Sequence, residues 1–189
     1  MARLQPNRAK IVEAILLLIE EAGRHRRTLT QYDVVKSLFI ADLWHLKKFG
    51  RPITFDNYVA MKFGPVPSEA YDMLKPIYAW RGTPQPEGWP LWDRKATEGS
   101  NVAHFENPRR SANRRKLSDT DVRELTEALS FVMNLGFGGV CDWTHMNPAY
   151  VDAWKARGDR KSNEMRYELL LEGKDKELIS ELAHASKHM

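Results

Sequence analysis

Cysteine and long apolar runs are scarce in this sequence of 189 residues. The only cysteine, Cys141, excludes an internal disulfide and a zinc module built on several cysteines. No apolar run approaches the ~20 residues that a membrane-spanning helix needs. The best stretch, residues 11–19, contains Glu13 and leads directly into Glu20 and Glu21, without the small residues of a signal-peptide cleavage site. We therefore expect a cytoplasmic protein that does not enter a membrane.

A recognisable catalytic apparatus is also missing. The glycine-rich run 136–139 follows a predicted helix and lacks a Walker lysine, which favours a helix end and hinge over a phosphate loop. Cys141 and His145, four residues apart, could form a thiol–imidazole pair. Two ligands do not make a zinc site, and catalysis would need an orienting third group. We expect no enzyme, metal site or cofactor, and interpret Cys141 as a small packing group.

Positive charge is in slight excess, with 29 Lys and Arg against 25 Asp and Glu and a net charge of +4. The excess is concentrated in two runs. The first holds Arg24, Arg26 and Arg27, and the second holds Arg109, Arg110, Arg114, Arg115 and Lys116. Such clusters can contact nucleic acid, but each lies in a predicted connecting segment, where solvated charge is usual. Nucleic acid is therefore an alternative partner.

Apolar residues at helical spacing predict a mainly α fold in a single compact domain spanning residues 1–189. Helices are expected over residues 9–22, from Thr28 or Thr30 to Phe49, after a cap at Ser68, and from Ser118 to the glycines at 136–139. Shorter helices should follow up to His145, over residues 148–154, and in a helical tail at 159–189. Residues 81–116 are expected to form a long Pro/Trp-rich loop, with at most a brief strand at 102–105 and its tryptophans packed on the body.

A small β-hairpin is predicted beside these helices. Residues 58–63 alternate as a strand does, and residues 52–55 could pair with them across a turn at 56–57. Residues 64–67 are predicted to form a rigid corner, because two of them are prolines with fixed φ angles. We expect Val59, Met61 and Phe63 to face the helices, and Tyr58 and Lys62 to face outward. One edge of this strand should be open to a partner.

Asp42 and His45 are three residues apart and share a helix face. They would suit an acid–base dyad or half of a metal site, or a structural hydrogen bond on a partly buried helix. No nucleophile or third ligand accompanies them, so we favour the structural or interface interpretation.

Two stretches, residues 39–54 and 58–72, resemble the signature of the Panacea domain, the SocA-like antitoxin family. A looser resemblance follows at residues 117–121, 144–145 and 153–154, so that the similarity covers about 9–158. The motif positions are Asp42, His45, Gly64, Tyr71, His145 and Trp154. Phe55 departs from the pattern, because family members often have glycine there.

The resemblance implies a helical domain that binds a toxin, often encoded beside it and in some cases in phage settings, and blocks it by direct contact. Aromatic residues and rigid prolines suit such an interface. The candidate contact residues are Trp44, Tyr58, Lys62, Pro65, Val66 and Pro67. A proteolytic adaptor and a phage-associated nucleic-acid-binding regulator are the alternatives, and the oligomeric state is not predicted.

Overall fold

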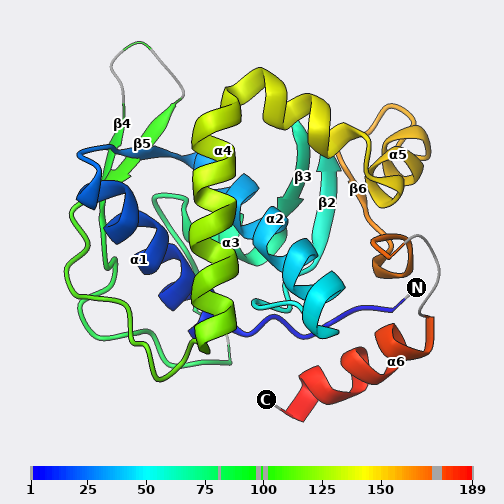
Figure 1. Ribbon diagram of the computed structural model, residues 1–189, viewed down its shortest axis with the longest axis horizontal. Coiled ribbons are helices and arrows are strands. Elements are labelled where there is room, and N and C mark those ends of the chain that lie inside the picture. Colours follow the sequence, from blue (N-terminus) through cyan, green and yellow to red (C-terminus); the bar gives the residue numbers. More distant parts are fainter. Residues whose placement is uncertain (1, 81, 97–98, 100–101, 172–175, 189) are drawn as a thin grey trace.

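Three long helices form the centre of the protein in the computed structural model, which describes residues 2–80, 82–96, 99, 102–171 and 176–188. They are α1 (Arg8–Arg24), α2 (Gln31–Phe49) and α4 (Asp119–His145). Helix α4 packs across α1 and α2 (Figure 1). Parts of the predicted 81–116 loop and of the tail, namely 81, 97–98, 100–101, 172–175 and 189, lie outside the described residues.

Local sequence explains where the long helices begin and end. Thr30 and Ser118 each form a capping box, with Asp33 and Asp121 respectively. Gly50 ends α2 in the left-handed conformation, at φ 72°. The predicted helix ends at Phe49 and Ser118 are confirmed, and so is the mainly α fold. Helix α1 is buried on both faces, as the apolar residues around its circumference predict.

The first residues of α3 (Ser68–Met73) are capped in an unexpected way. The predicted Ser68 cap is wrong, because this side chain makes no capping hydrogen bond. Instead the buried Asp56 carboxylate accepts the backbone N–H groups of Glu69 and Ala70, at 3.0 and 2.9 Å. Burial raises the pKa of Asp56 to about 7, against the opposing effect of these hydrogen bonds.

The strand after residue 57 pairs differently from the prediction. Strand β2 (Tyr58–Met61) lies between β3 (Gly64–Pro67) and β6 (Asn163–Glu164), antiparallel to both. The predicted pairing with residues 52–55 is therefore wrong, and so is the open edge, since β6 occupies it. The predicted proline corner is itself a strand. Its two prolines are tolerated because β3 lies at the edge of the sheet.

The orientation of β2 is also the reverse of the prediction. Tyr58 and Ala60 are buried, whereas Phe63 is 48% exposed. Tyr58 packs edge-on against Phe39 of α2, with ring centroids 5.2 Å apart, and this contact fixes the inward face of the strand. Because side chains alternate along a strand, fixing Tyr58 inward reverses the predicted pattern over the strand residues 58–61, whereas Lys62 and Phe63 lie in the turn that follows. The outward position of Lys62 agrees with the prediction.

The Pro/Trp-rich segment contains a second hairpin that was not predicted in full. Strand β4 (Asp93–Ala96) pairs with β5 (Ala103–Glu106), and β5 pairs with β1 (Leu29–Thr30). A strand near 102–105 is confirmed, but the rest of the segment is more ordered than a loop. Trp92 is buried against Trp89, with centroids 5.1 Å apart, so the predicted packing of these tryptophans is confirmed.

The C-terminal segment begins as strand β6 and is not helical throughout, as the tail prediction had it. After α5 (Pro148–Lys155) and β6 come the short helix η1 (Tyr167–Leu169), α6 (Lys176–Ala185) and η2 (Ser186–His188). Leu170 and Ile179 are buried in the same core as the long helices. The N-terminal segment contacts the C-terminal one, because the Gln5 N–H donates to Ser186 Oγ at 2.9 Å.

Candidate partner-binding surface

Asp42 and His45 form hydrogen bonds with different groups and do not make up the acid–base dyad considered above. The buried Asp42 carboxylate accepts the N–H groups of Ile53 and Thr54, at 2.7 and 2.9 Å, and the Tyr58 hydroxyl at 2.5 Å. Burial raises the pKa of Asp42, although these hydrogen bonds oppose the shift. The carboxylate thus holds the segment leading into β2 against α2. This arrangement matches the structural interpretation.

His45 belongs to a second buried network, centred on Asp121. Its Nε2 lies 3.1 Å from an Asp121 oxygen, and its Nδ1 lies 2.8 Å from the Arg51 carbonyl oxygen. Lys10 and Arg51 donate to the same carboxylate, at 2.6 and 2.8 Å. Burial alone would raise the pKa of Asp121, but the hydrogen bonds from His45 and Lys10 outweigh it and hold that pKa well below its usual range. The network ties α1 and α2 to the first turn of α4.

Gly64 is required where β3 meets α2 and α4. Its φ of +99° is unfavourable for other residues, and an added Cβ would lie 2.6 Å from Thr144 Oγ1 and 2.9 Å from Lys36 Nζ. Lys36 is 1% exposed and donates to the Pro65 carbonyl oxygen at 2.7 Å. Burial lowers the pKa of Lys36 to about 7.

His145 and Trp154 belong to a stacked aromatic series. His145 stacks on Tyr150 with centroids 4.4 Å apart, and Tyr150 stacks on Trp154 at 5.9 Å. The Cys141 thiol lies 3.5 Å from His145 Nε2. Burial raises the pKa of Cys141 and lowers the pKa of His145, which opposes a thiolate–imidazolium pair.

The six predicted contact residues do not form one exposed surface. Four of them are buried, namely Tyr58, Pro65, Val66 and Pro67. Trp44 is half-buried and packs edge-on against Phe131 and Trp143, at 5.4 and 6.5 Å. Only Lys62 is exposed. The prediction of Tyr58 as an outward contact is therefore wrong, because its hydroxyl is engaged by Asp42 inside the core.

An exposed aromatic surface lies beside Lys62, formed by Tyr32, Phe63 and Phe137. Phe63 and Phe137 are 48% and 54% exposed, and their ring centroids are 5.4 Å apart. Tyr32 packs on Phe137 at 4.6 Å, and its hydroxyl donates to the Phe137 carbonyl oxygen at 3.1 Å. The three residues come from the start of α2, the β2–β3 turn and the interior of α4.

A break in α4 brings Phe137 to this surface. Gly136 has φ 70° and ψ 176°, a conformation that other residues rarely adopt. The helix changes direction there, and its last part crosses near the ends of β2 and β3 (Figure 1). The predicted hinge at the glycine run is thus confirmed. It turns a large apolar residue toward the β2–β3 turn.

The aromatic surface borders a groove of about 270 Å³. Its lining includes Tyr32, Val35, Lys36, Met61, Phe63 and Tyr71. A neighbouring hollow of about 370 Å³ shares Gln31 and Tyr32 and is bordered by Phe137 and Val102. The motif residue Tyr71 therefore lies at the groove, with Lys75 Nζ 4.9 Å from its ring centroid.

Sequence reasoning placed Phe63 in the core and did not single out Tyr32, Lys36 or Phe137. One signal was present: Phe63 and Phe137 are large apolar residues immediately beside glycine, in a turn and in a helix break. Such positions rarely lie inside a core. Their proximity could not be predicted from the sequence, because they are 74 positions apart.

The described part of the chain contains no candidate metal-binding group and no candidate membrane-spanning helix. No group of three or more His, Cys, Asp or Glu residues there is arranged to hold a metal ion. Nor does any helix there have the length and apolar character needed to cross a membrane.

Fold and surface together define a class: a mainly α domain with two small antiparallel sheets and an exposed aromatic groove at the point where α2, α4 and the β2–β3 hairpin meet. Residues 34–155, nearly two thirds of the chain, match the family described as antitoxin SocA-like, Panacea domain. The chain belongs to this family. The predicted family is confirmed, although the match begins at residue 34 and not at 9. Comparisons with curated proteins and with solved structures gave no match.

The family match also bears on Phe55, the departure from the family pattern. Phe55 has φ 56° and is buried. Glycine is the residue that adopts this left-handed conformation at least cost. The glycine that the resemblance implies at this position would thus fit the backbone conformation that Phe55 adopts.

Proposed function

We propose that this protein is an antitoxin that neutralises a partner toxin by direct binding, and that the aromatic surface is where the toxin docks. The toxin is expected to be encoded beside it. The antitoxin description of the family supports the class of partner. The location rests on the contact between Phe63 and Phe137, each about half exposed. Phe63 lines a groove of mainly apolar side chains, and Phe137 borders the neighbouring hollow.

The physical argument rests on what such side chains do in water. Burying exposed aromatic rings against a partner lowers the free energy of the complex. A few aromatic anchors usually contribute most of the affinity of an interface. Here the anchors come from a strand turn and two helices, so their backbone is already ordered. Binding then costs little conformational entropy. Lys62 lies over the Phe63 ring at 5.3 Å and supplies a charged rim to the apolar centre.

A binding role also fits the chemistry of the most reactive groups. Cys141 is the candidate nucleophile, yet burial raises the pKa of its thiol, whereas nucleophilic cysteines have lowered values. His145 is stacked on Tyr150 and has its own pKa lowered by burial. We therefore propose that neutralisation requires no catalytic step.

The test is co-expression with the gene product of the adjacent reading frame. The wild-type protein should restore growth and co-purify with that product. The double variant Phe63→Ala/Phe137→Ala should lose both properties, because each anchor is worth roughly 2 kcal/mol of binding free energy. Its folding stability should change little, since both rings are exposed at the surface.

The matched control is Ile77→Ala/Met146→Ala. It also removes two exposed apolar side chains, 86% and 71% exposed, but neither lines the groove. This control should neutralise as the wild type does. Full neutralisation by the Phe63→Ala/Phe137→Ala variant would show that the interface lies elsewhere. Failure of the wild-type protein to restore growth would refute the antitoxin proposal itself.

A further inference from the structure

The net positive charge of this protein comes from the two basic runs. Residues 24–27 and 109–116 contain eight of the 29 Lys and Arg residues and no Asp or Glu. The rest of the chain holds 21 basic and 25 acidic residues, so that it is net negative. The excess positive charge of the whole molecule therefore belongs to these runs.

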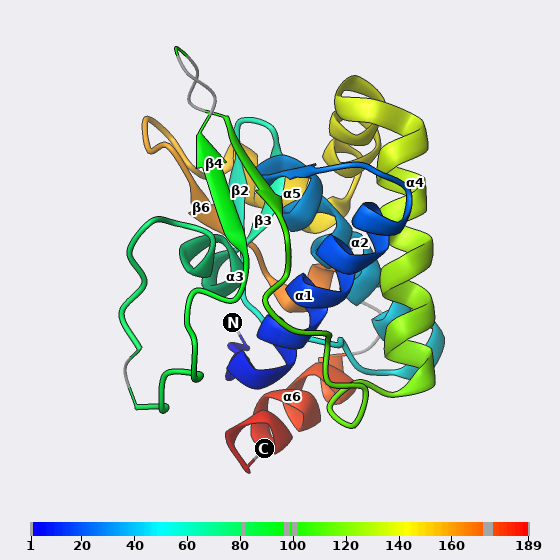
Figure 2. The same ribbon diagram turned by 90° about the vertical axis from the view of Figure 1, so that its left-hand side faces the viewer.

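The two runs lie along the same helix. The first is the C-terminal end of α1 and the turn after it. The second follows β5 and is fixed on α1 by two glutamates. Arg110 donates to both oxygens of Glu13, at 2.8 and 2.7 Å, and the Ala112 N–H donates to Glu20 at 3.2 Å. In Figure 2 the chain after β5 passes beside α1.

Four of the seven guanidinium groups in the two runs form no ion pair within the described residues. Arg26, Arg27, Arg114 and Arg115 are exposed, and within the described ranges their side chains have no acidic partner. Arg110 is different, since Glu13 neutralises it and it anchors the segment. The basic surface is defined as these four arginines together with Lys116 and Arg24. Arg24 has an acidic partner, Glu21, at 2.5 Å, so the charge presented to solvent comes mainly from the other five.

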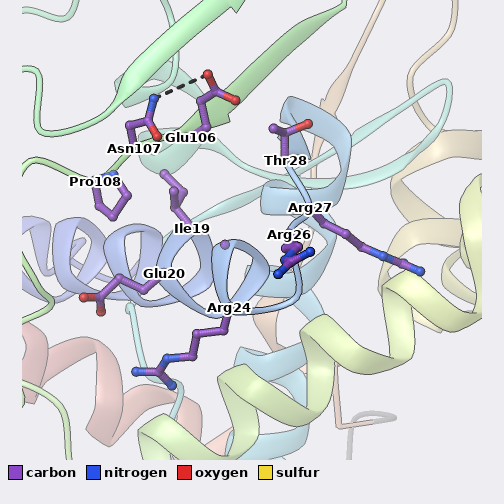
Figure 3. A pocket seen from close by; sticks show the side chains of 10 residues that line it. Ile19, Glu20, Arg24, Arg26, Arg27, Thr28, Glu106, Asn107 and Pro108 are labelled. Carbon is purple, nitrogen blue, oxygen red and sulfur yellow. Dashed lines mark hydrogen bonds between the residues drawn. The ribbon is translucent and has the colours of Figure 1, made fainter.

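A groove of about 500 Å³ opens at the first run. Arg24, Arg26 and Arg27 extend from the end of α1 in different directions (Figure 3). Two acids also line this groove, but each has a partner: Glu106 is paired with Lys95, and Glu20 accepts the Ala112 N–H.

Arg26 occupies a position that favours glycine. It ends the turn after α1 with φ 55°, where a residue with a Cβ is strained and glycine is the usual choice. An arginine at this position stabilises the fold less than glycine would. Its side chain projects from the turn beside Arg27, which suggests a role outside folding.

We propose that the basic surface binds the phosphate backbone of nucleic acid, as a function additional to toxin binding. None of the exposed large apolar side chains of the described residues lies in either run, so this surface lacks the aromatic and apolar anchors that accompany arginine in protein interfaces. Arginines spread along a helix suit a row of phosphates instead. Glu13 and Arg24 are eleven residues apart, about 16 Å at 1.5 Å per residue, and this length spans several phosphates.

The test is the binding of a labelled 20-base-pair DNA duplex, and of an RNA duplex of the same sequence, measured by fluorescence anisotropy over a range of salt concentrations. The wild-type protein should bind at least one duplex with an affinity that falls steeply with salt. Arg26→Gln/Arg27→Gln and Arg114→Gln/Arg115→Gln should each weaken binding about tenfold or more. Each should also reduce the salt slope by about 0.9 per lost phosphate contact.

Lys155→Gln/Lys161→Gln is the matched control, because it removes two exposed positive charges away from α1. It should bind as the wild type does. Arg26→Gly adds an independent readout: this variant should unfold at a higher temperature yet bind more weakly. All these variants should still neutralise the toxin, which separates this proposal from the previous one.

Three results would overturn the proposal. The first is the absence of salt-dependent binding to either duplex. The second is equal weakening by the lysine control, which would mean that only net charge matters. The third is binding of polyglutamate as tightly as of the duplexes, which would assign the surface to an acidic protein.

Discussion

Among the residues that line the groove, Lys36 has an environment that is unusual for a lysine, because its side chain is buried. Its ammonium is enclosed between α2 and β3, with the Pro65 carbonyl oxygen at 2.7 Å and the Tyr32 ring centroid at 5.2 Å. A lysine removed from water favours its neutral form, so its pKa falls to about 7 from 10.5. Burial of this amine makes folding stability depend on pH.

The sign of that dependence follows from proton counting. Between pH 7 and 10.5 the unfolded chain keeps the Lys36 proton and the folded chain releases it. The free energy of unfolding therefore rises with pH across this window. Below pH 7 both states hold the proton, and the burial penalty is complete.

We predict that Lys36→Met, which removes the titrating group, lacks this rise. The stability of the wild type relative to Lys36→Met should increase by a few kcal/mol, on the order of 1.4 kcal/mol per pH unit, between pH 7 and 10. Urea denaturation at several pH values measures it. Lys47→Met controls for the loss of an exposed ammonium. A constant difference between wild type and Lys36→Met over this window would contradict the assignment.

At the scale of elements, the β2–β3 hairpin can approach α2 and α4 closely only because position 64 is glycine. Gly64→Ala should lower the free energy of unfolding by about 2–4 kcal/mol, because the new Cβ meets Thr144 and Lys36 and the backbone has φ +99°. Gly138→Ala is the contrast: its Cβ meets nothing within 4 Å, and alanine favours the helix by roughly 0.5–1 kcal/mol. Thermal unfolding of both variants gives the comparison. Equal stability of the two would show that the hairpin is not tightly seated.

The helices could be predicted from the sequence because their signals are local. Thr30 and Ser118 lie three residues before the acids that complete their capping boxes, and Gly50 follows directly on its helix. The strand partners could not be predicted, because distant groups decide them. The Asp42 carboxylate accepts hydrogen bonds from the backbone N–H groups of Ile53 and Thr54, so this segment is held against α2 and does not pair with β2.

The remaining partner of β2, strand β6, lies about a hundred residues further along the chain. Its short polar sequence at Asn163–Glu164 carries no strand signal. The candidate surface has the same non-local origin. Phe63 and Phe137 meet because Gly136 bends α4 and because the buried Tyr58 reverses the faces of β2. The motif residues Asp42, His45 and Gly64 could be identified from the sequence, but their role is to hold the elements that present the aromatic rings.

At the scale of the whole molecule, the family region spans α2 to α5, and segments outside it pack against its core. Helix α1 is tied to this region through Lys10 and Asp121, and the C-terminal segment through the Tyr167 hydroxyl, which donates to the Asp56 carbonyl oxygen at 2.6 Å. Phe63 and Phe137 of the aromatic surface lie within the family region, and Tyr32 lies two residues before it. The first basic run, residues 24–27, lies outside it.

The central claim is that the aromatic surface blocks a toxin by contact alone. The most direct measurement mixes the purified protein with the purified product of the adjacent gene, with no protease present, and follows toxin activity and complex formation by titration. We predict stoichiometric inhibition, with a stable complex that the Phe63→Ala/Phe137→Ala variant fails to form. Inhibition that appears only when an ATP-dependent protease is added, or no complex with the wild-type protein, would contradict the claim.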